Sequence, residues 1–178
     1  MRLAAFVIAL AVLAPTLFVP SALAQSPQYA ALRADAERLF AEGSYVRSRE
    51  IYLQAKTLTL PRDDARWVDF RLADTLWRSE SATPSADTTK MEAASEVLNA
   101  FIREPKRVED RDRVWAEANE SLGDFYWIRR DYRNSGAAWP FYRNALDWWA
   151  GTADIEMARS RYLNIVWRMS EPPNAQPY

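Results

Sequence analysis

The stretch from 36 to 55, AERLFAEGSYVRSREIYLQA, decides the fold. Apolar residues recur at the spacing of a helix from Ala36 until Gly43, and glycine commonly ends helices. A second helical face follows the turn and includes Tyr52 and Ala55. The stretch therefore predicts two helices joined by a tight turn.

A second stretch, from 122 to 145, LGDFYWIRRDYRNSGAAWPFYRNA, repeats this order. Gly123, Tyr142 and Ala145 take the places of the small residue, the tyrosine and the alanine of the first stretch. Small residues let two helices approach closely, and a large ring fills the space between neighbouring helices. Another small residue, Ala73, predicts the same close packing in the middle of the chain.

The same periodicity predicts seven helical segments and no strand. Six of them form three antiparallel pairs, at 27–60, 63–103 and 110–150, and a single helix follows at 152–169. Prolines, isolated glycines and a polar loop at 79–88 separate the segments. The predicted fold class is therefore all-α, a short stack of antiparallel helix pairs.

Acidic and hydroxyl side chains mark where several helices are expected to begin. Asp63 or Asp64 is expected to cap the third helix, and Thr89 with Glu92 has the pattern of a capping box for the fourth. The sequence EDRD at 109–112 places acids at the positive end of the fifth helix.

The two repeated stretches resemble the tetratricopeptide repeat, a helix–turn–helix unit of about 34 residues that stacks into a solenoid. This resemblance implies a right-handed stack of about three divergent units plus a terminal helix, within residues 25–169. It also implies a concave groove lined by the first helix of each unit. The chain departs from the family at Ser48, where the family has an alanine, and in the middle unit, whose second helix lacks the signature.

Three other segments are similar to the helical part near the front of large secreted bacterial macroglobulin-like proteins. They are RWVDFRLADTLWRS at 66–79, EDRDRVWAEANESLGDF at 109–125 and YRNALDWWAG at 142–151. This second resemblance implies that the chain is the helical lead domain of a longer secreted protein.

The first 24 residues have the order of a secretory signal peptide. A short basic start precedes an apolar run at 3–19, and Ala-Leu-Ala at 22–24 supplies a cleavage site of the small-x-small type. Cleavage leaves a helical domain at 25–169 and a proline-rich tail at 170–178, without a stable membrane anchor. Because the chain has no cysteine, a periplasmic or secreted location in a Gram-negative-type bacterium suits it better than a disulfide-rich exterior.

Composition excludes several kinds of site. The chain has no cysteine and no histidine, which removes thiolate metal sites and the commonest catalytic base. A net charge of -1 provides no basic field for nucleic acid, and the four glycines form no phosphate-binding loop. We therefore expect no metal, no cofactor and no nucleic-acid partner.

Carboxylates leave one enzymatic alternative open. Paired carboxylates hydrolyse glycosidic bonds, and Glu120 and Asp124 lie one helical turn apart. A polysaccharide-acting enzyme of this type is the alternative to a protein without catalytic residues. Helix capping and solvated helix faces account for most of the acidic side chains.

Transferring the register of the repeat family by position predicts the residues of the groove. A row of aromatic residues crosses the first helices of the units, and charged or polar residues lie beside it. The predicted groove residues are Arg33, Phe40, Trp67, Phe70, Asp74, Trp77, Arg78, Glu120, Asp124, Trp127, Asn164, Trp167 and Arg168. The sequence leaves open whether these tryptophans are exposed or form the core. The expected partner is a protein or peptide segment, held by aromatic anchors and arginines.

Overall fold

The computed structural model describes residues 26–82, 87–129 and 133–170. These residues form seven α-helices and one short 3-10 turn, and contain no strand. The helices are α1 (Pro27–Ala41), α2 (Tyr45–Lys56), α3 (Arg62–Ser81), α4 (Thr88–Arg103), α5 (Arg113–Trp127), α6 (Ser135–Ala150) and α7 (Ile155–Ser170). The all-α prediction is confirmed, with the three expected pairs followed by a single helix. The signal peptide at 1–24 and all but the first residue of the predicted tail lie outside the described residues.

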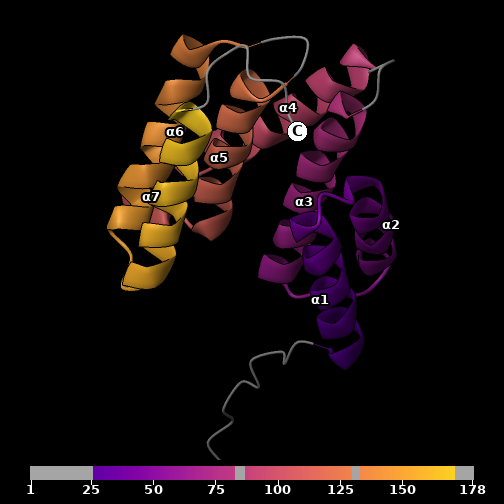
Figure 1. The fold of residues 1–178 in the computed structure, drawn as a ribbon. Coiled ribbons are helices and arrows are strands. Elements are labelled where there is room, and N and C mark those ends of the chain that lie inside the picture. The colour runs from indigo at the N-terminus through magenta and orange to yellow at the C-terminus, as the bar shows by residue number, and fades with distance from the viewer. Residues whose placement is uncertain (1–25, 83–86, 130–132, 171–178) are drawn as a thin grey trace, which may run out of the picture.

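Each helix packs mainly against its neighbours in the chain. Contacts run in order from α1 to α7, and α3 also contacts α5. Figure 1 shows α1 and α2, in indigo, at one end of this arrangement and α6 and α7, in orange and yellow, at the other. Contacts of this kind, between elements that are close in sequence, are typical of helical repeats.

The small residues of the two repeated stretches lie where helices meet. Ala36 and Ala55 are fully buried, and a Cβ atom added to Gly123 would lie 2.5 Å from Cδ1 of Tyr142. Ser48, which stands where the repeat family has an alanine, donates its Oγ–H to the carbonyl oxygen of Ala36 at 2.9 Å. The pair α1/α2 therefore accommodates a buried hydroxyl because the partner helix supplies an acceptor.

The start of α3 differs from the prediction. Its N-cap is Pro61, and Asp63 and Asp64 lie in the first turn without capping the helix. Proline is favoured at the start of a helix because it has no N–H to leave unpaired. The two carboxylates still lie near the positive end of the helix dipole, which stabilises them there.

The start of α4 also differs, whereas α5 begins as expected. The side chain of Asp87 accepts a hydrogen bond from the backbone N–H of Lys90, so the capping box predicted at 89–92 is wrong. Asp112, the last residue of the EDRD sequence, accepts from the backbone N–H of Trp115 at 2.8 Å and caps α5.

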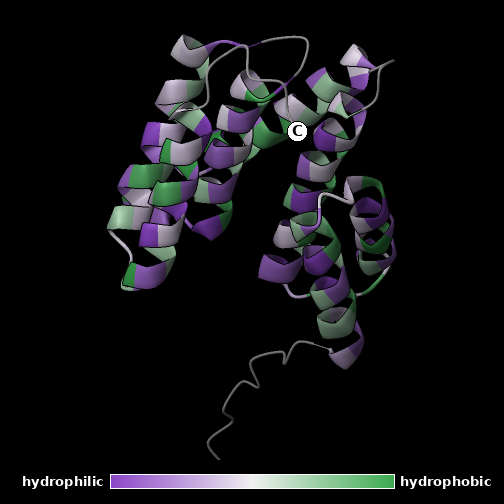
Figure 2. Cartoon of the chain, in the orientation of Figure 1, coloured by the Kyte–Doolittle hydropathy of each residue, from purple (hydrophilic) through white to green (hydrophobic). Residues whose placement is uncertain are grey.

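The helices are amphipathic, and α7 is the least buried of them. Figure 2 shows hydrophobic and hydrophilic residues alternating along the helices. Of the residues described in α7, Ile165 alone is buried, while Ile155, Tyr162 and Val166 are exposed. Among the described helices, none combines the length and the apolar character that crossing a membrane requires.

Candidate functional site

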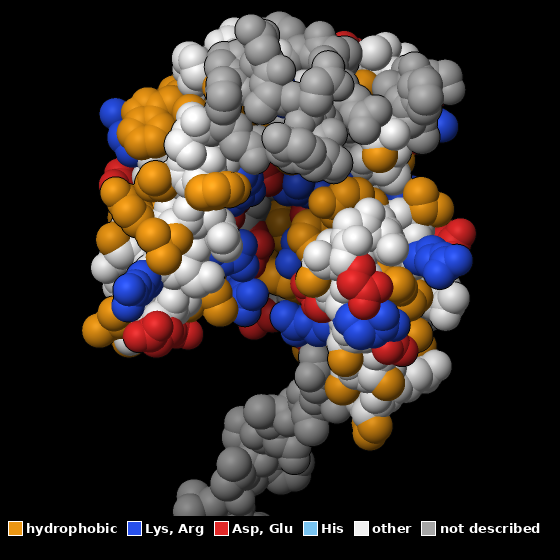
Figure 3. Space-filling view, viewed as in Figure 1, with side chains coloured by type: hydrophobic (Ala, Val, Ile, Leu, Met, Phe, Trp, Pro, Cys, Tyr) orange, Lys and Arg blue, Asp and Glu red, His pale blue; other side chains and the backbone are white. Residues whose placement is uncertain are grey.

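A groove of about 500 Å³ is lined by side chains of α1, α3, α5 and α7. Three of these helices contribute polar residues with the same spacing, i, i+3 and i+7, which places each set on one helix face. The sets are Arg71, Asp74 and Arg78 on α3, Glu117, Glu120 and Asp124 on α5, and Arg161, Asn164 and Arg168 on α7. Figure 3 shows basic and acidic side chains gathered in the hollow between the two halves of the molecule.

Arginines from both neighbouring helices bind the carboxylates of α5. Arg78 Nη2, from α3, lies 2.6 Å from Asp124 Oδ2, and Arg168 Nη1, from α7, lies 2.5 Å from Asp124 Oδ1. Arg161 Nη2 lies 2.6 Å from Glu117 Oε1. A row of acids on α5 thus lies between arginines of α3 and arginines of α7. Buried charges attract more strongly than surface charges, so these pairs hold the three helices in register.

Glu37 brings α1 into the same network. Its carboxylate accepts hydrogen bonds from Arg71 Nε at 2.9 Å and from Arg71 Nη2 at 2.8 Å, and a third from Trp67 Nε1 at 2.9 Å. Burial raises the pKa of Glu37, but the charge and hydrogen bonds of Arg71 outweigh it, so the pKa lies below its usual value. The carboxylate is therefore ionised and fixed in place on the groove wall.

Glu120 is the central acid of the α5 row. Burial raises its pKa, and although Arg161 acts in the opposite direction, the nearby Glu117 raises it further. The pKa of Glu120 therefore lies above its usual value. Its Oε1 accepts a hydrogen bond from Trp149 Nε1 at 2.7 Å, and its Oε2 lies 3.3 Å from Arg161 Nη1.

Asp124, one turn further along α5, has the opposite shift. Burial raises its pKa too, but Arg168 and Arg78 outweigh burial and leave the pKa below its usual value. The hydroxyl of Tyr142 donates to Asp124 Oδ1 at 2.6 Å, which favours the ionised form further. Two arginines reach Asp124 at short distance, whereas Glu120 has close acidic neighbours. This difference shifts the pKa values of the two carboxyls in opposite directions.

Most of the aromatic residues predicted for the groove lie in the core. Of the six aromatic residues predicted for the groove, four are at most 6% exposed: Trp67, Phe70, Trp77 and Trp127. Trp77 Nε1 donates to Ser121 Oγ at 2.9 Å, and Trp127 Nε1 donates to the carbonyl oxygen of Arg168 at 2.7 Å. The core interpretation is thus correct for these four. They are buried beneath the groove lining and cannot act as exposed anchors.

Most of the other predicted residues lie together on the lining of the groove. Those that line the groove are Phe40, Asp74, Arg78, Glu120, Asp124, Asn164, Trp167 and Arg168. Phe40 is half-buried, and Trp167 is 70% exposed. Arg33 does not line the groove; it pairs with Asp64 at 3.4 Å and lies over the ring of Trp67.

The charged groove residues that were not predicted are Glu37, Arg71, Glu117 and Arg161. The signal for three of them was present in the sequence, because they precede Asp74, Glu120 and Asn164 by three residues each. Each helix residue turns about 100° from the one before it. Phe70 and Trp77, each one position before a charged groove residue of α3, therefore point into the core instead.

No group of three or more acidic, histidine or cysteine side chains in the described part of the chain is arranged to hold a metal ion. Comparison of the chain with protein-family models, with curated proteins and with solved structures gave no significant match.

Proposed function

We propose that this chain is a secreted, non-enzymatic scaffold whose groove binds a segment of another protein. In this proposal the fold is a divergent tetratricopeptide-type stack, and the first helix of each unit lines the groove. One observation carries the proposal: α1, α3, α5 and α7 enclose a groove of about 500 Å³, with the exposed ring of Trp167 on its lining. Tryptophan and arginine are the residue types that dominate binding hot spots.

The groups that a partner reaches are held in place before it binds. Arg161 and Arg168 have side chains 21% and 25% exposed, and both are fixed by carboxylates of α5. Fixed side chains lose little conformational entropy on binding, which favours affinity. A partner segment with an apolar residue for Trp167 and with backbone or carboxylate oxygens for the two arginines fits this surface.

Site-specific photo-crosslinking tests the proposal. Trp167 is replaced by a benzophenone amino acid in exported protein, and Trp139, which is 46% exposed on α6 outside the groove, is replaced in a matched control. We expect position 167 to capture peptides of one defined partner sequence and position 139 not to capture them. Capture of the same proteins from both positions, or of none from 167, contradicts the proposal.

A loss-of-binding variant completes the test. Trp167→Ala removes an exposed ring, so it should change the free energy of unfolding by less than about 1 kcal/mol. We expect the purified variant to lose affinity for the cross-linked segment while Trp139→Ala retains it. A Trp167→Ala chain that binds the segment as the parent does would exclude this ring from the binding surface.

The pKa shifts favour one second candidate, a polysaccharide-acting enzyme. A carboxyl with a raised pKa one turn from an ionised carboxylate matches the acid and the base of glycoside hydrolysis. The arginines on both carboxylates favour the scaffold, because a base that is bound by a guanidinium accepts a proton less readily. Release of reducing sugar from polysaccharide by the parent, and its loss in Glu120→Gln, would support the enzyme instead.

A further inference from the structure

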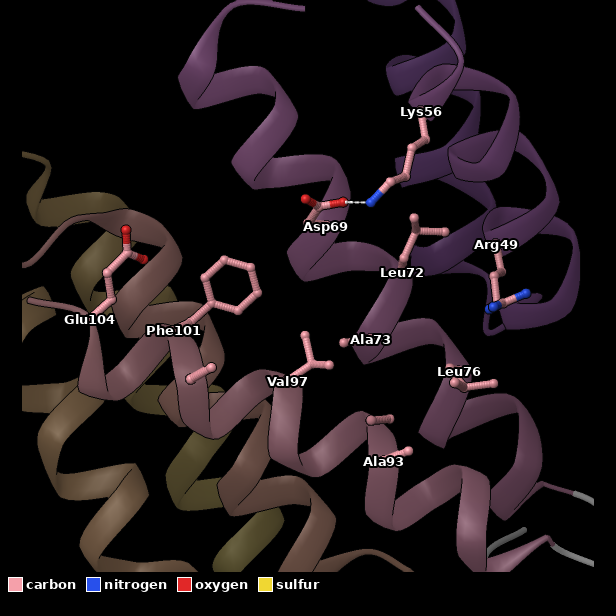
Figure 4. A pocket seen from close by; sticks show the side chains of 12 residues that line it. Arg49, Lys56, Asp69, Leu72, Ala73, Leu76, Ala93, Val97, Phe101 and Glu104 are labelled. Carbon is pink, nitrogen blue, oxygen red and sulfur yellow. Dashed lines mark hydrogen bonds and ion pairs between the residues drawn. The ribbon is translucent and has the colours of Figure 1, made fainter.

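A second hollow, of about 600 Å³, lies on a different face of α3, between α2 and α4. Leu72 and Leu76 line it from α3, and Val97 and Phe101 line it from α4 (Figure 4). Leu72 and Leu76 are each two residues from Asp74, about 200° around the helix axis. The hollow is therefore separate from the groove, and its volume is in the range of small-molecule sites.

Arg49 lies at one end of this hollow and Glu104 at the other (Figure 4). In the described part of the chain, Nε of Arg49 is a buried nitrogen without a hydrogen-bond partner. The other charged side chains on the lining are paired, Lys56 with Asp69 and Glu104 with Arg66. None of the other residues that line the hollow pairs with Arg49 (Figure 4), so the charge of its guanidinium is available to an anion there.

We propose that the hollow binds an alkyl carboxylate, a fatty-acid-type anion whose carboxylate pairs with Arg49 and whose chain lies on Leu76 and Val97. The planar guanidinium matches the two oxygens of a carboxylate. The part of α4 from Ala93 to Phe101 extends about 12 Å, which provides an apolar surface for a chain of medium length. The negative charge of Glu104 at the opposite end disfavours a carboxylate there, which gives the ligand one direction.

Calorimetric titration of the purified chain with two amphiphiles of equal chain length tests the proposal. The probes are dodecanoate and dodecyltrimethylammonium, both kept below the concentration at which they form micelles. We expect one saturable dodecanoate site, with an affinity at least about tenfold higher than for the cation. Equal affinities, or no saturation with dodecanoate, would overturn the proposal, and this comparison needs no variant.

Two variants locate the site. Arg49→Met removes the guanidinium and keeps the apolar stem, and we expect it to weaken dodecanoate binding by about tenfold or more. Arg47→Met, on the exposed face of the same helix, is the matched control and should bind dodecanoate as the parent does. Unchanged affinity in Arg49→Met, or equal loss in both variants, would contradict the assignment.

Val97→Glu tests occupation of the hollow by a second copy of the chain. Val97 is 45% exposed, so a glutamate at this position should leave the chain folded while placing a negative charge beside the alkyl chain. We expect loss of dodecanoate binding with an unchanged sedimentation coefficient of the free chain. A change from dimer to monomer would assign the hollow to a second copy and overturn the proposal.

Discussion

At the residue scale, a close helix contact lies between Gly123 of α5 and the ring of Tyr142 of α6. A methyl group at Gly123 would lie 2.5 Å from Cδ1 and Cε1 of that ring. Replacing glycine by alanine inside a helix ordinarily adds up to about 1 kcal/mol of stability, but overpacking costs roughly 1–3 kcal/mol. Because Tyr142 is fully buried and also donates a hydrogen bond to Asp124, it has little room to move.

We therefore expect Gly123→Ala to lower the free energy of unfolding by about 1–3 kcal/mol in urea titrations. Gly136→Ala is the control, because a methyl group there meets its nearest atom, Asn134 Oδ1, at 3.4 Å, which is an ordinary contact. That variant should be as stable as the parent or slightly more stable. A Gly123→Ala chain that gains stability would show that α5 and α6 are not in close contact here.

Glu120 and Asp124 should give opposite pH dependences of stability. The folded-state pKa of Asp124 is lowered, so its contribution is present above the unfolded pKa, about 3.9, and is lost as the pH falls. The folded-state pKa of Glu120 is raised, so its contribution is present below the unfolded pKa, about 4.3, and is lost as the pH rises.

Urea unfolding between about pH 3 and pH 8 measures both effects. The stability difference between the parent and Asp124→Asn should be roughly 3–5 kcal/mol at neutral pH, since a buried ion pair is broken, and should shrink below about pH 4. The difference between the parent and Glu120→Gln should instead decrease as the pH rises above about 4.3. If both differences change in the same direction, the charge distribution described for α5 is wrong.

At the scale of the element, α7 differs from the helices before it in how it is held. Ile165 is the buried side chain among the residues described in α7, and it packs with Trp127, Ala138 and Tyr142. The partly buried Met157, Ala158 and Met169 of α7 add apolar contacts, and Arg161 and Arg168 pair with acids of α5. Helices with few buried apolar contacts open locally before the whole protein unfolds.

We expect Ile165→Ala to release α7 preferentially. Truncating a buried isoleucine costs about 2–5 kcal/mol, which should appear as faster amide hydrogen exchange in α7 than in α3 or α5. Val166→Ala, one residue along and 44% exposed, should change exchange little. Equal acceleration throughout the chain would show that α7 unfolds together with the rest.

At the scale of the whole molecule, the prediction to check first is processing. The apolar run at 3–19 and the Ala-Leu-Ala sequence at 22–24 predict cleavage after Ala24. Intact-mass measurement of exported protein should therefore give a chain that begins at Gln25. An exported chain that retains Met1 would contradict both the cleavage and the proposed release from the membrane.

The sequence determined the helices and their pairing, because these depend on local patterns. Apolar periodicity, prolines and glycines placed seven helices close to their observed bounds, and Ala36 and Gly123 indicated where pairs pack closely. Some helix starts were missed because several polar residues near each start can cap it. At α4, Asp87 provides the cap, whereas the pattern favoured Thr89.

Only the tertiary structure decided which side of each helix faces the groove. α3 has apolar residues on two adjoining faces, and which of them is buried depends on helices that are distant in sequence. Trp77 packs with Phe125 of α5 in the core, where Ser121 accepts its N–H, and Arg78 lines the groove, where Asp124, 46 residues away, binds it. Local periodicity cannot predict an ion pair between residues so far apart in the chain, because each charged residue alone would fit a solvated surface equally well.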